Sequence, residues 1–182
     1  MTTYIALLRG INVTGHNKIK MTDLIQLFLD LGYLDVLTYI QSGNVLFKSE
    51  EQETSKIEQS IVKAIKNKFE YSVTVLVLVK NQIESIYNSN PFIEKIQNLD
   101  RSKLHATFLN RAPDLDGISQ IKNLLNTNND EFQIIDKTVY LYCPNGYGKT
   151  KLNNNLFEKK LKVNATTRNW KTITKLFELS QQ

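Results

Sequence analysis

The sequence has a single cysteine, Cys143, among its 182 residues. No disulfide can therefore form within the chain, which is typical of a protein from a reducing compartment. Histidine is almost as rare, with only His16 and His105. Because structural zinc sites need four Cys or His ligands at short spacings, we expect neither a metal site nor a cofactor.

Long hydrophobic runs are also missing. The N-terminal apolar stretch covers only residues 5–8 before Arg9 interrupts it. Such a stretch is too short for the core of a signal peptide and far too short to span a bilayer. We therefore expect a cytoplasmic protein that makes no contact with a membrane.

Acidic residues are scarce at the C-terminal end. The chain carries a net charge of +5, and from residue 146 onward eight lysines and arginines face only two glutamates. This tail accounts for +6, and the remaining chain carries −1. The asymmetry suggests an anionic partner, such as a phosphorylated ligand or a nucleic acid. The alternative is a solvated lysine surface that only keeps the protein soluble.

The first half of the chain alternates strands and helices. Apolar spacing predicts strands over residues 3–8, 39–41, 45–47 and 73–79, and helices over 22–31 and from Ser55 to Phe69. Ser55 and Glu58 have the spacing of a capping box at the start of the second helix. The order β-α-β-β-α-β is that of the ferredoxin-like, split β-α-β fold. Right-handed crossovers then place strands one and three in the middle of the sheet.

The second half repeats most of this order. We expect a helix over 81–87, an irregular link, a strand over 104–109, a helix marked by Ile118 and Leu125, a hairpin of strands 132–135 and 139–143, and helices over 152–161 and 168–179. A helix stands where the fourth strand is due. The sequence thus predicts an α+β fold of two ferredoxin-like halves, residues 1–80 and 104–182, joined by a helical linker, 81–103. The second half is expected to lack its last strand and to end in a helix.

Three sequence blocks, residues 6–13 (ALLRGINV), 39–44 (YIQSGN) and 165–172 (ATTRNWKT), closely resemble a bacterial family catalogued only as domain-of-unknown-function family 1697. The resemblance runs the full length of the chain. It implies a cytoplasmic α+β protein of two ferredoxin-like halves, and it brings no activity with it. Thr14 stands where the family typically has glycine, and Thr150 where it typically has serine.

The first candidate site combines Arg9, Asn12, Gln41, Ser42 and Asn44. In the predicted sheet, strands one and two run the same way, so the end of strand one, the hairpin turn and the start of the first helix share one edge. A helix N-terminus offers free N–H groups, and Arg9 adds a bidentate cation, which together favour an anion. The alternative is that Arg9 pairs with a local carboxylate and Asn12 caps a loop.

The second candidate is Gly-Tyr-Gly-Lys-Thr at residues 146–150, between a predicted strand and a predicted helix. It resembles the end of a phosphate-binding loop, but Cys143 stands where that motif needs its first glycine. Lys149 and Thr150 remain candidate donors to a phosphate at the helix start. The alternative is a turn in which Thr150 caps the helix.

The third candidate is Arg168 with Asn169, which the helical pattern places at the start of the last helix together with Lys171. Cations there oppose the helix dipole, and no acidic residue follows until Glu178, so they favour an anionic ligand or a distant carboxylate. Trp170 is more consistent with a core residue than with a surface on which a nucleic-acid base stacks.

These patterns lead to three hypotheses. The preferred one is a binding protein that presents Arg9, Lys149 and Arg168 to a phosphate-bearing ligand, a nucleotide or RNA. The second is an enzyme for a small phosphorylated or carboxylated metabolite, with Ser42, Asn44 and Thr150 in polar roles. The third is a regulatory module that binds another protein through a sheet edge. The sequence does not decide between turnover and binding, and it leaves the ligand and the oligomeric state open.

Overall fold

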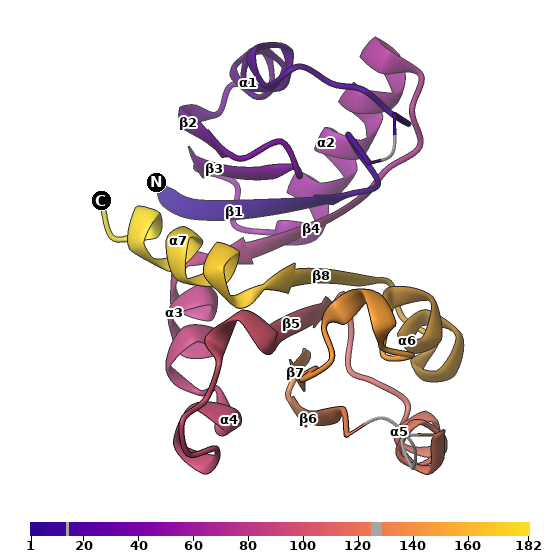
Figure 1. The fold of residues 1–182 in the computed structure, drawn as a ribbon. Helices are drawn as coiled ribbons and strands as arrows, with labels where there is room; N and C mark the ends of the chain where they lie inside the picture. Colours follow the sequence, from indigo (N-terminus) through magenta and orange to yellow (C-terminus); the bar gives the residue numbers. More distant parts are fainter. Residues whose placement is uncertain (14, 125–128) are drawn as a thin grey trace. The chain divides into compact units, whose positions relative to one another are not determined.

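The computed structural model describes residues 1–13, 15–124 and 129–182. Predictions that involve Thr14 and Leu125 lie outside these residues. The chain forms two compact units, and each contains a β-sheet (Figure 1). Unit 1 comprises residues 1–85 and 176–182, and unit 2 comprises residues 86–175. The boundary therefore falls inside helix α3 (Lys80–Asn88), whereas the sequence predicted a separate linker.

Unit 1 contains a four-stranded antiparallel sheet with the order β2-β3-β1-β4. Strands one and three are the central ones, as the sequence predicted. The helices and strands of unit 1 begin and end within a few residues of the predicted positions, except that the second strand starts five residues earlier than predicted. The elements are β1 (Thr2–Arg9), α1 (Met21–Asp30), β2 (Leu34–Tyr39), β3 (Asn44–Ser49), α2 (Thr54–Phe69) and β4 (Thr74–Val79).

One face of this sheet packs against α1 and α2 (Figure 1). Alternation along β1 directs Tyr4, Ala6 and Leu8 into that core, and directs Ile5, Leu7 and Arg9 to the opposite face. Helix α2 contributes a buried stripe of isoleucines at four-residue spacing, Ile57, Ile61 and Ile65.

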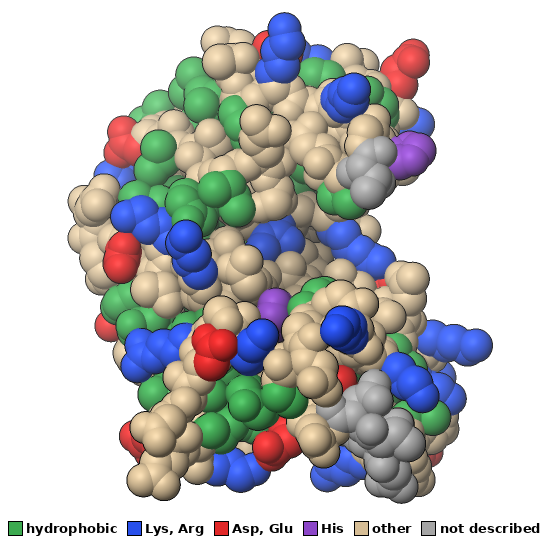
Figure 2. Space-filling model, viewed as in Figure 1, with side chains coloured by type: hydrophobic (Ala, Val, Ile, Leu, Met, Phe, Trp, Pro, Cys, Tyr) green, Lys and Arg blue, Asp and Glu red, His purple; other side chains and the backbone are tan. Residues whose placement is uncertain are grey.

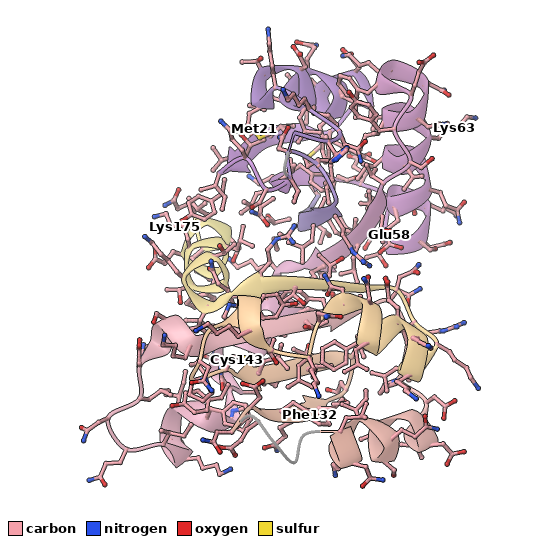
Figure 3. The ribbon with its side chains drawn as sticks, turned by 45° about the vertical axis from the view of Figure 1, so that its right-hand side comes forward. Met21, Glu58, Lys63, Phe132, Cys143 and Lys175 are labelled. Atoms are coloured by element: carbon pink, nitrogen blue, oxygen red, sulfur yellow. The ribbon has the colours of Figure 1, made fainter. Side chains whose placement is uncertain are left out.

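The predicted capping box at the start of α2 does not form. Glu53 is the N-cap residue, and no side chain caps the helix. The carboxylate of Glu58 instead accepts a hydrogen bond of 2.8 Å from the backbone N–H of Val77 on β4. Figure 3 shows Glu58 on the side of α2 that faces β4, while Lys63 points away from the sheet. Glu58 thus ties the helix to the sheet.

The edge strand β2 carries an irregularity. Its register with β3 shifts between Leu34 and Leu37, and Asp35 within this segment has a φ of 50°. The side chains of Leu34 and Leu37 are exposed.

Unit 2 contains a second four-stranded antiparallel sheet, with the order β6-β7-β5-β8. The predicted α+β class is therefore confirmed. Its elements after α3 are α4 (Pro91–Lys95), η1 (Arg101–Lys103), β5 (Leu104–Leu109), α5 (Leu115–Leu124), β6 (Glu131–Ile135), β7 (Thr138–Tyr142), η2 (Tyr147–Lys149), α6 (Asn154–Leu161), β8 (Ala165–Asn169) and α7 (Trp170–Ser180), whose end belongs to unit 1.

The prediction that the second half lacks its fourth strand was wrong. Strand β8 pairs with β5 along its length, with Arg168 opposite Ala106 and Thr166 opposite Phe108. Two consecutive threonines favour extended backbone. Asn169 then stops the strand, because its Oδ1 accepts a hydrogen bond from the N–H of Thr172 and so caps α7.

The core of unit 2 lies between its sheet and helices α5 and α6 (Figure 1). Leu141, Cys143 and Phe157 are fully buried there. On the other face of the sheet, the ring of Trp170 stacks on that of Tyr87, with centroids 6.0 Å apart. Trp170 is therefore a core residue, as the sequence indicated. Within the described ranges, no helix is both long and apolar enough to cross a membrane.

Candidate functional site

In unit 1, the end of β1 and the hairpin turn lie together, as predicted. The N–H of Leu8 donates to the carbonyl oxygen of Gly43 at 2.7 Å, and Leu7 pairs with Asn44. The loop after β1 reaches the same turn, because Nδ2 of Asn12 donates to the carbonyl oxygen of Gln41 at 3.0 Å. These contacts bring the sequence-predicted residues to one edge of the sheet.

Three of these residues use their side chains to build that edge. Asn12 also exchanges two hydrogen bonds of 2.9 Å with the backbone of Ile19. Asn44 is fully buried, and its Nδ2 donates to the carbonyl oxygen of Tyr39 and to Oγ of Ser42. Asn12, Ser42 and Asn44 therefore have a structural role in this turn, which corresponds to the alternative given for Asn12.

A groove with a volume of about 670 Å³ opens at the start of α1. We call it the α1 groove. Gln41 supplies a primary amide from the hairpin turn, and Lys18 and Lys20 supply two positive charges from the loop before the helix. The residues that line it include Asn12, Lys18, Lys20, Thr22, Asp23 and Gln41.

The electrostatics of the α1 groove favour an anion. Lys20 is the N-cap residue of α1, and no side chain accepts hydrogen bonds from the first turn. The partial positive charge of the helix start therefore adds to the two lysines. Asp23, in the first turn, opposes them with one negative charge. The sequence analysis missed both lysines, although a Lys-x-Lys pair directly before a predicted helix is a readable signal.

Arg9 is not among the described residues that line the α1 groove. Because side chains alternate along β1, it projects from the sheet face opposite α1 and α2. The predicted combination of Arg9 with the start of the first helix therefore does not occur in unit 1.

The loop at residues 146–150 in unit 2 does not open a helix. It forms the short η2 turn, and α6 begins only at Asn154, capped by Oδ1 of Asn153. Thr150 donates from Oγ1 to Asp130 at 2.6 Å and accepts from the N–H of Leu152 at 3.0 Å. A phosphate-binding loop leads directly into a helix, and this loop does not, so that part of the interpretation was wrong. The alternative, in which Thr150 caps the helix, was also wrong. Lys149 is exposed.

The side chains near this loop that could act in catalysis are buried. Figure 3 places Cys143 inside unit 2, where burial raises the pKa of its thiol to about 11. The value of about 11 already includes a contribution from Asp130, which raises the pKa, and one from the side-chain hydrogen bond with Thr150, which lowers it. The ring of His105 stacks on Tyr147 at 4.7 Å, and burial lowers its pKa. Among the described residues, no three His, Cys, Asp or Glu side chains gather to hold a metal ion.

Arg168 is a strand residue, so its predicted place in the first turn of the last helix was wrong. It is half-buried, and burial lowers its pKa to about 10, which leaves the guanidinium charged at neutral pH. Its Nη1 donates to the carbonyl oxygen of Thr167 at 3.0 Å.

Lys149 and Arg168 lie on opposite faces of the unit 2 sheet. The neighbour of Arg168, Thr167, hydrogen-bonds to Asn154 of α6, so Arg168 points away from that helix. The loop of Lys149 packs on the α6 side through Tyr147. Within unit 2 the structure does not bring these two cations together. Lys and Arg side chains are spread over the visible surface among acidic ones (Figure 2), as on a solvated surface.

Comparison with known proteins gives the fold and a family but no activity. The model of one family, described as "Protein of unknown function (DUF1697)", matches residues 1–140. Among solved structures, the chain is similar to the conserved bacterial protein SP0830 from Streptococcus pneumoniae, with a TM-score of 0.70, 22% sequence identity and 98% of each chain covered. At this identity the likeness shows the fold alone. No curated protein matches the chain.

Proposed function

Since the chain belongs to the DUF1697 family of proteins of unknown function, we propose a function from the geometry of unit 1: the α1 groove binds a phosphate-bearing ligand, a nucleotide or RNA. The observation that carries this proposal is the groove itself. It places two lysines and the uncapped start of α1 around one open space of about 670 Å³. Phosphate groups favour such a combination of backbone N–H groups, helix dipole and cations.

Other sequence-predicted contacts remain part of the proposal within their own units. Gln41 presents its exposed side chain to the α1 groove. Arg9 in unit 1, and Lys149, Arg168 and Asn169 in unit 2, do not line the α1 groove, and each remains a separate candidate contact for a phosphate group in its own unit. For Asn169 this role is limited to Nδ2, because its Oδ1 caps α7. The strand orders β2-β3-β1-β4 and β6-β7-β5-β8 also support our inference that both units are ferredoxin-like.

The hypothesis of an enzyme receives less support from the geometry. Ser42, Asn44 and Thr150 were its candidate polar residues, and the side chains of all three take part in hydrogen bonds within the protein. A buried Asn44 that closes its own turn is not accessible to a substrate. Binding is therefore the function that we propose.

The test is fluorescence anisotropy with a labelled single-stranded RNA and, separately, a labelled nucleotide. We expect binding at about 50 mM salt that weakens as salt rises, with a log–log slope of roughly −0.7 for each RNA phosphate neutralised. Replacing Lys18 and Lys20 together by Gln should weaken binding by roughly tenfold or more and reduce the slope by about 1.4.

The matched control is the double variant Lys63→Gln/Lys122→Gln. It also removes two exposed lysines, from α2 and α5, but neither lines the α1 groove. We expect it to bind nearly as well as the wild type. If neither probe binds at about 50 mM salt, or if both double variants weaken binding equally, the α1 groove is not the site. Binding of the nucleotide alone would identify a small ligand and exclude RNA.

A further inference from the structure

A second pocket in unit 1 lies where α1 ends and the chain turns towards β2. Its volume is about 450 Å³, within the usual range of small-molecule sites. We call it the Tyr33 pocket. Over the described part of the chain it shares no lining residue with the α1 groove, and none of its residues was a candidate in the sequence analysis. The residues that line it include Leu31, Tyr33, Glu50, Glu51, Lys56 and Ser60.

Tyr33 places a rigidly held phenol group in this pocket. The residue is 7% exposed, and its ring packs against the rings of Phe47 and Phe28, with centroids 4.6 Å and 5.8 Å away. These contacts fix the ring in the core of unit 1, so the position of its hydroxyl group is fixed as well. The hydroxyl has no hydrogen-bond partner among the described residues, yet it keeps contact with solvent. It is therefore accessible to a ligand, and no other part of the described chain uses it.

Negative charge lies next to this hydroxyl. Burial raises the pKa of the Tyr33 phenol, and so does the nearby carboxylate of Glu51. The phenol is therefore neutral at physiological pH, and its oxygen can accept a hydrogen bond. A hydrogen bond from the N–H of Glu53, together with the charge of Lys56, lowers the pKa of the Glu51 carboxyl, which is thus ionised. The exposed Glu50 brings a second carboxylate to the pocket.

The end of α1 adds to this negative charge. Leu31 and Gly32 line the pocket just past the last turn of the helix, which contains no basic residue. The carbonyl groups of that turn carry partial negative charge and favour a cation. Lys56, the amino group of Met1 and the start of α2 oppose them. Lys56, however, pairs with Glu53 at 2.8 Å, which leaves the carboxylates of the pocket in excess.

We propose that the Tyr33 pocket binds a small organic cation through its ammonium or guanidinium group. The N–H donors of that group bond to the hydroxyl oxygen of Tyr33 and to the carboxylate of Glu51, while Glu50 adds charge at the rim. The partly buried side chain of Leu31 offers an apolar surface to the rest of the ligand. The two ends of α1 then serve ligands of opposite charge, an anion at its start and a cation at its end.

The experiment uses the full-length, ¹⁵N-labelled protein and follows the backbone amide resonances of Gly32, Tyr33 and Glu51 by NMR. The probes are n-butylammonium chloride and n-butylguanidinium chloride. Sodium chloride at equal ionic strength and n-butanol, which has the same alkyl chain without a charge, are the controls. We expect a saturable shift with at least one probe and none with either control. The two probes, titrated separately, show which cationic group the site prefers.

Variants in the pocket make the test specific. Tyr33→Phe removes only the hydroxyl group and keeps the ring in place. It should weaken binding by roughly tenfold, the size of one hydrogen bond to a charged group, while the melting temperature stays at or above that of the wild type. Glu51→Gln should weaken binding to a similar extent, and Lys56→Gln should strengthen it. The matched control is Glu70→Gln, which removes an exposed carboxylate of unit 1 that does not line the pocket.

Three outcomes would overturn the proposal. One is a shift that fails to saturate, or that is unchanged in Tyr33→Phe and Glu51→Gln. Another is a lower melting temperature for Tyr33→Phe, which would mean that the folded protein itself uses the hydroxyl. The third is equal weakening by Glu70→Gln, which indicates a general effect of charge. The Lys18/Lys20 double variant should leave these shifts unchanged, so the two proposed sites are tested independently.

Discussion

Asn12 and Gln41 lie 29 positions apart in the sequence, and a hydrogen bond from Nδ2 of Asn12 to the carbonyl oxygen of Gln41 joins them at 3.0 Å. The same amide also donates to and accepts from the backbone of Ile19. One side chain therefore fixes the loop after β1, the hairpin turn and the approach to α1. The shape of the α1 groove depends on it.

The first prediction concerns this side chain. Asn12 has a φ of 54°, so glycine is the substitution that removes the amide without adding backbone strain. We expect Asn12→Gly to lower the free energy of unfolding by about 2–3 kcal/mol, because three hydrogen bonds disappear. Urea denaturation measures this. The matched control is Asn17→Gly, which also has a positive φ but loses a single exposed bond to Gly10. Equal losses in both variants would contradict the proposed role of Asn12.

Gly43 provides the second prediction. It has a φ of 76°, and a Cβ atom there would lie 2.7 Å from Cβ of Leu8 and 2.9 Å from Cδ1 of Ile11. Gly43→Ala should therefore cost roughly 2–5 kcal/mol, from left-handed backbone strain and overpacking together. Gly10→Ala isolates the strain, since Gly10 has a φ of 81° and open space around it. It should cost only about 1–2 kcal/mol. Similar losses of stability in both variants would show that the turn shifts to accommodate the added Cβ atom at no extra cost.

The third prediction follows from the buried His105. Its folded pKa lies below the ordinary value of 6.5, because burial disfavours the charged ring. Below about pH 6.5 the unfolded chain therefore binds the proton first, and stability should fall as the pH drops. Above that value His105 contributes no pH dependence. Denaturation at about pH 7.5 and pH 5.5 measures the difference, which should shrink in His105→Phe but persist in His16→Gln. An unchanged difference in His105→Phe would mean that other groups cause it.

Cys143 gives the fourth prediction. A thiol with a pKa of about 11 is almost entirely protonated at neutral pH, and this one is also buried. We expect the native protein to react very slowly with a thiol reagent such as DTNB at about pH 8. The guanidinium-unfolded chain should react rapidly with one equivalent. Fast reaction of the native protein would show that this part of unit 2 opens readily.

Periodic apolar patterns predicted most of the fold. The isoleucine stripe of α2 and the apolar β1 and β4 strands identified the framework of unit 1, because burial on one face selects such patterns. Strand β5 was predicted with its observed bounds, Leu104–Leu109. These elements carry their own signal, so no distant partner is needed to recognise them.

Elements that depend on distant partners were missed. Strand β8 is stabilised by its pairing with β5. The helical pattern that begins at Trp170 can be extended toward the N-terminus to include Arg168, so the sequence predicted a helix there. Glu58 has the spacing of a capping box, but a backbone N–H on β4 competes for its carboxylate. The local sequence does not show that β8 pairs with β5 or that Glu58 accepts a hydrogen bond from β4.

In the candidate sites, too, some features could be predicted from the sequence, and others depend on distant parts of the chain. The meeting of Asn12 with the hairpin turn followed from strand directions, which topology determines. The contribution of Lys18 and Lys20 depends on where a loop folds across α1, and no periodicity describes that. Asn90 before Pro91 did carry a local signal, since this pair is a common helix start. The sequence does not show, however, that Nδ2 of its side-chain amide is buried with no hydrogen-bond partner among the described residues.

The irregular pairing of β2 with β3 has a consequence for the behaviour of the protein at high concentration. An edge strand with exposed leucines, such as Leu34 and Leu37, would ordinarily template the addition of strands from other molecules. The register shift between these two residues, and the left-handed Asp35 within it, bend the strand so that a straight incoming chain cannot continue the ladder. Straightening this segment should therefore make the chain more prone to form fibrils.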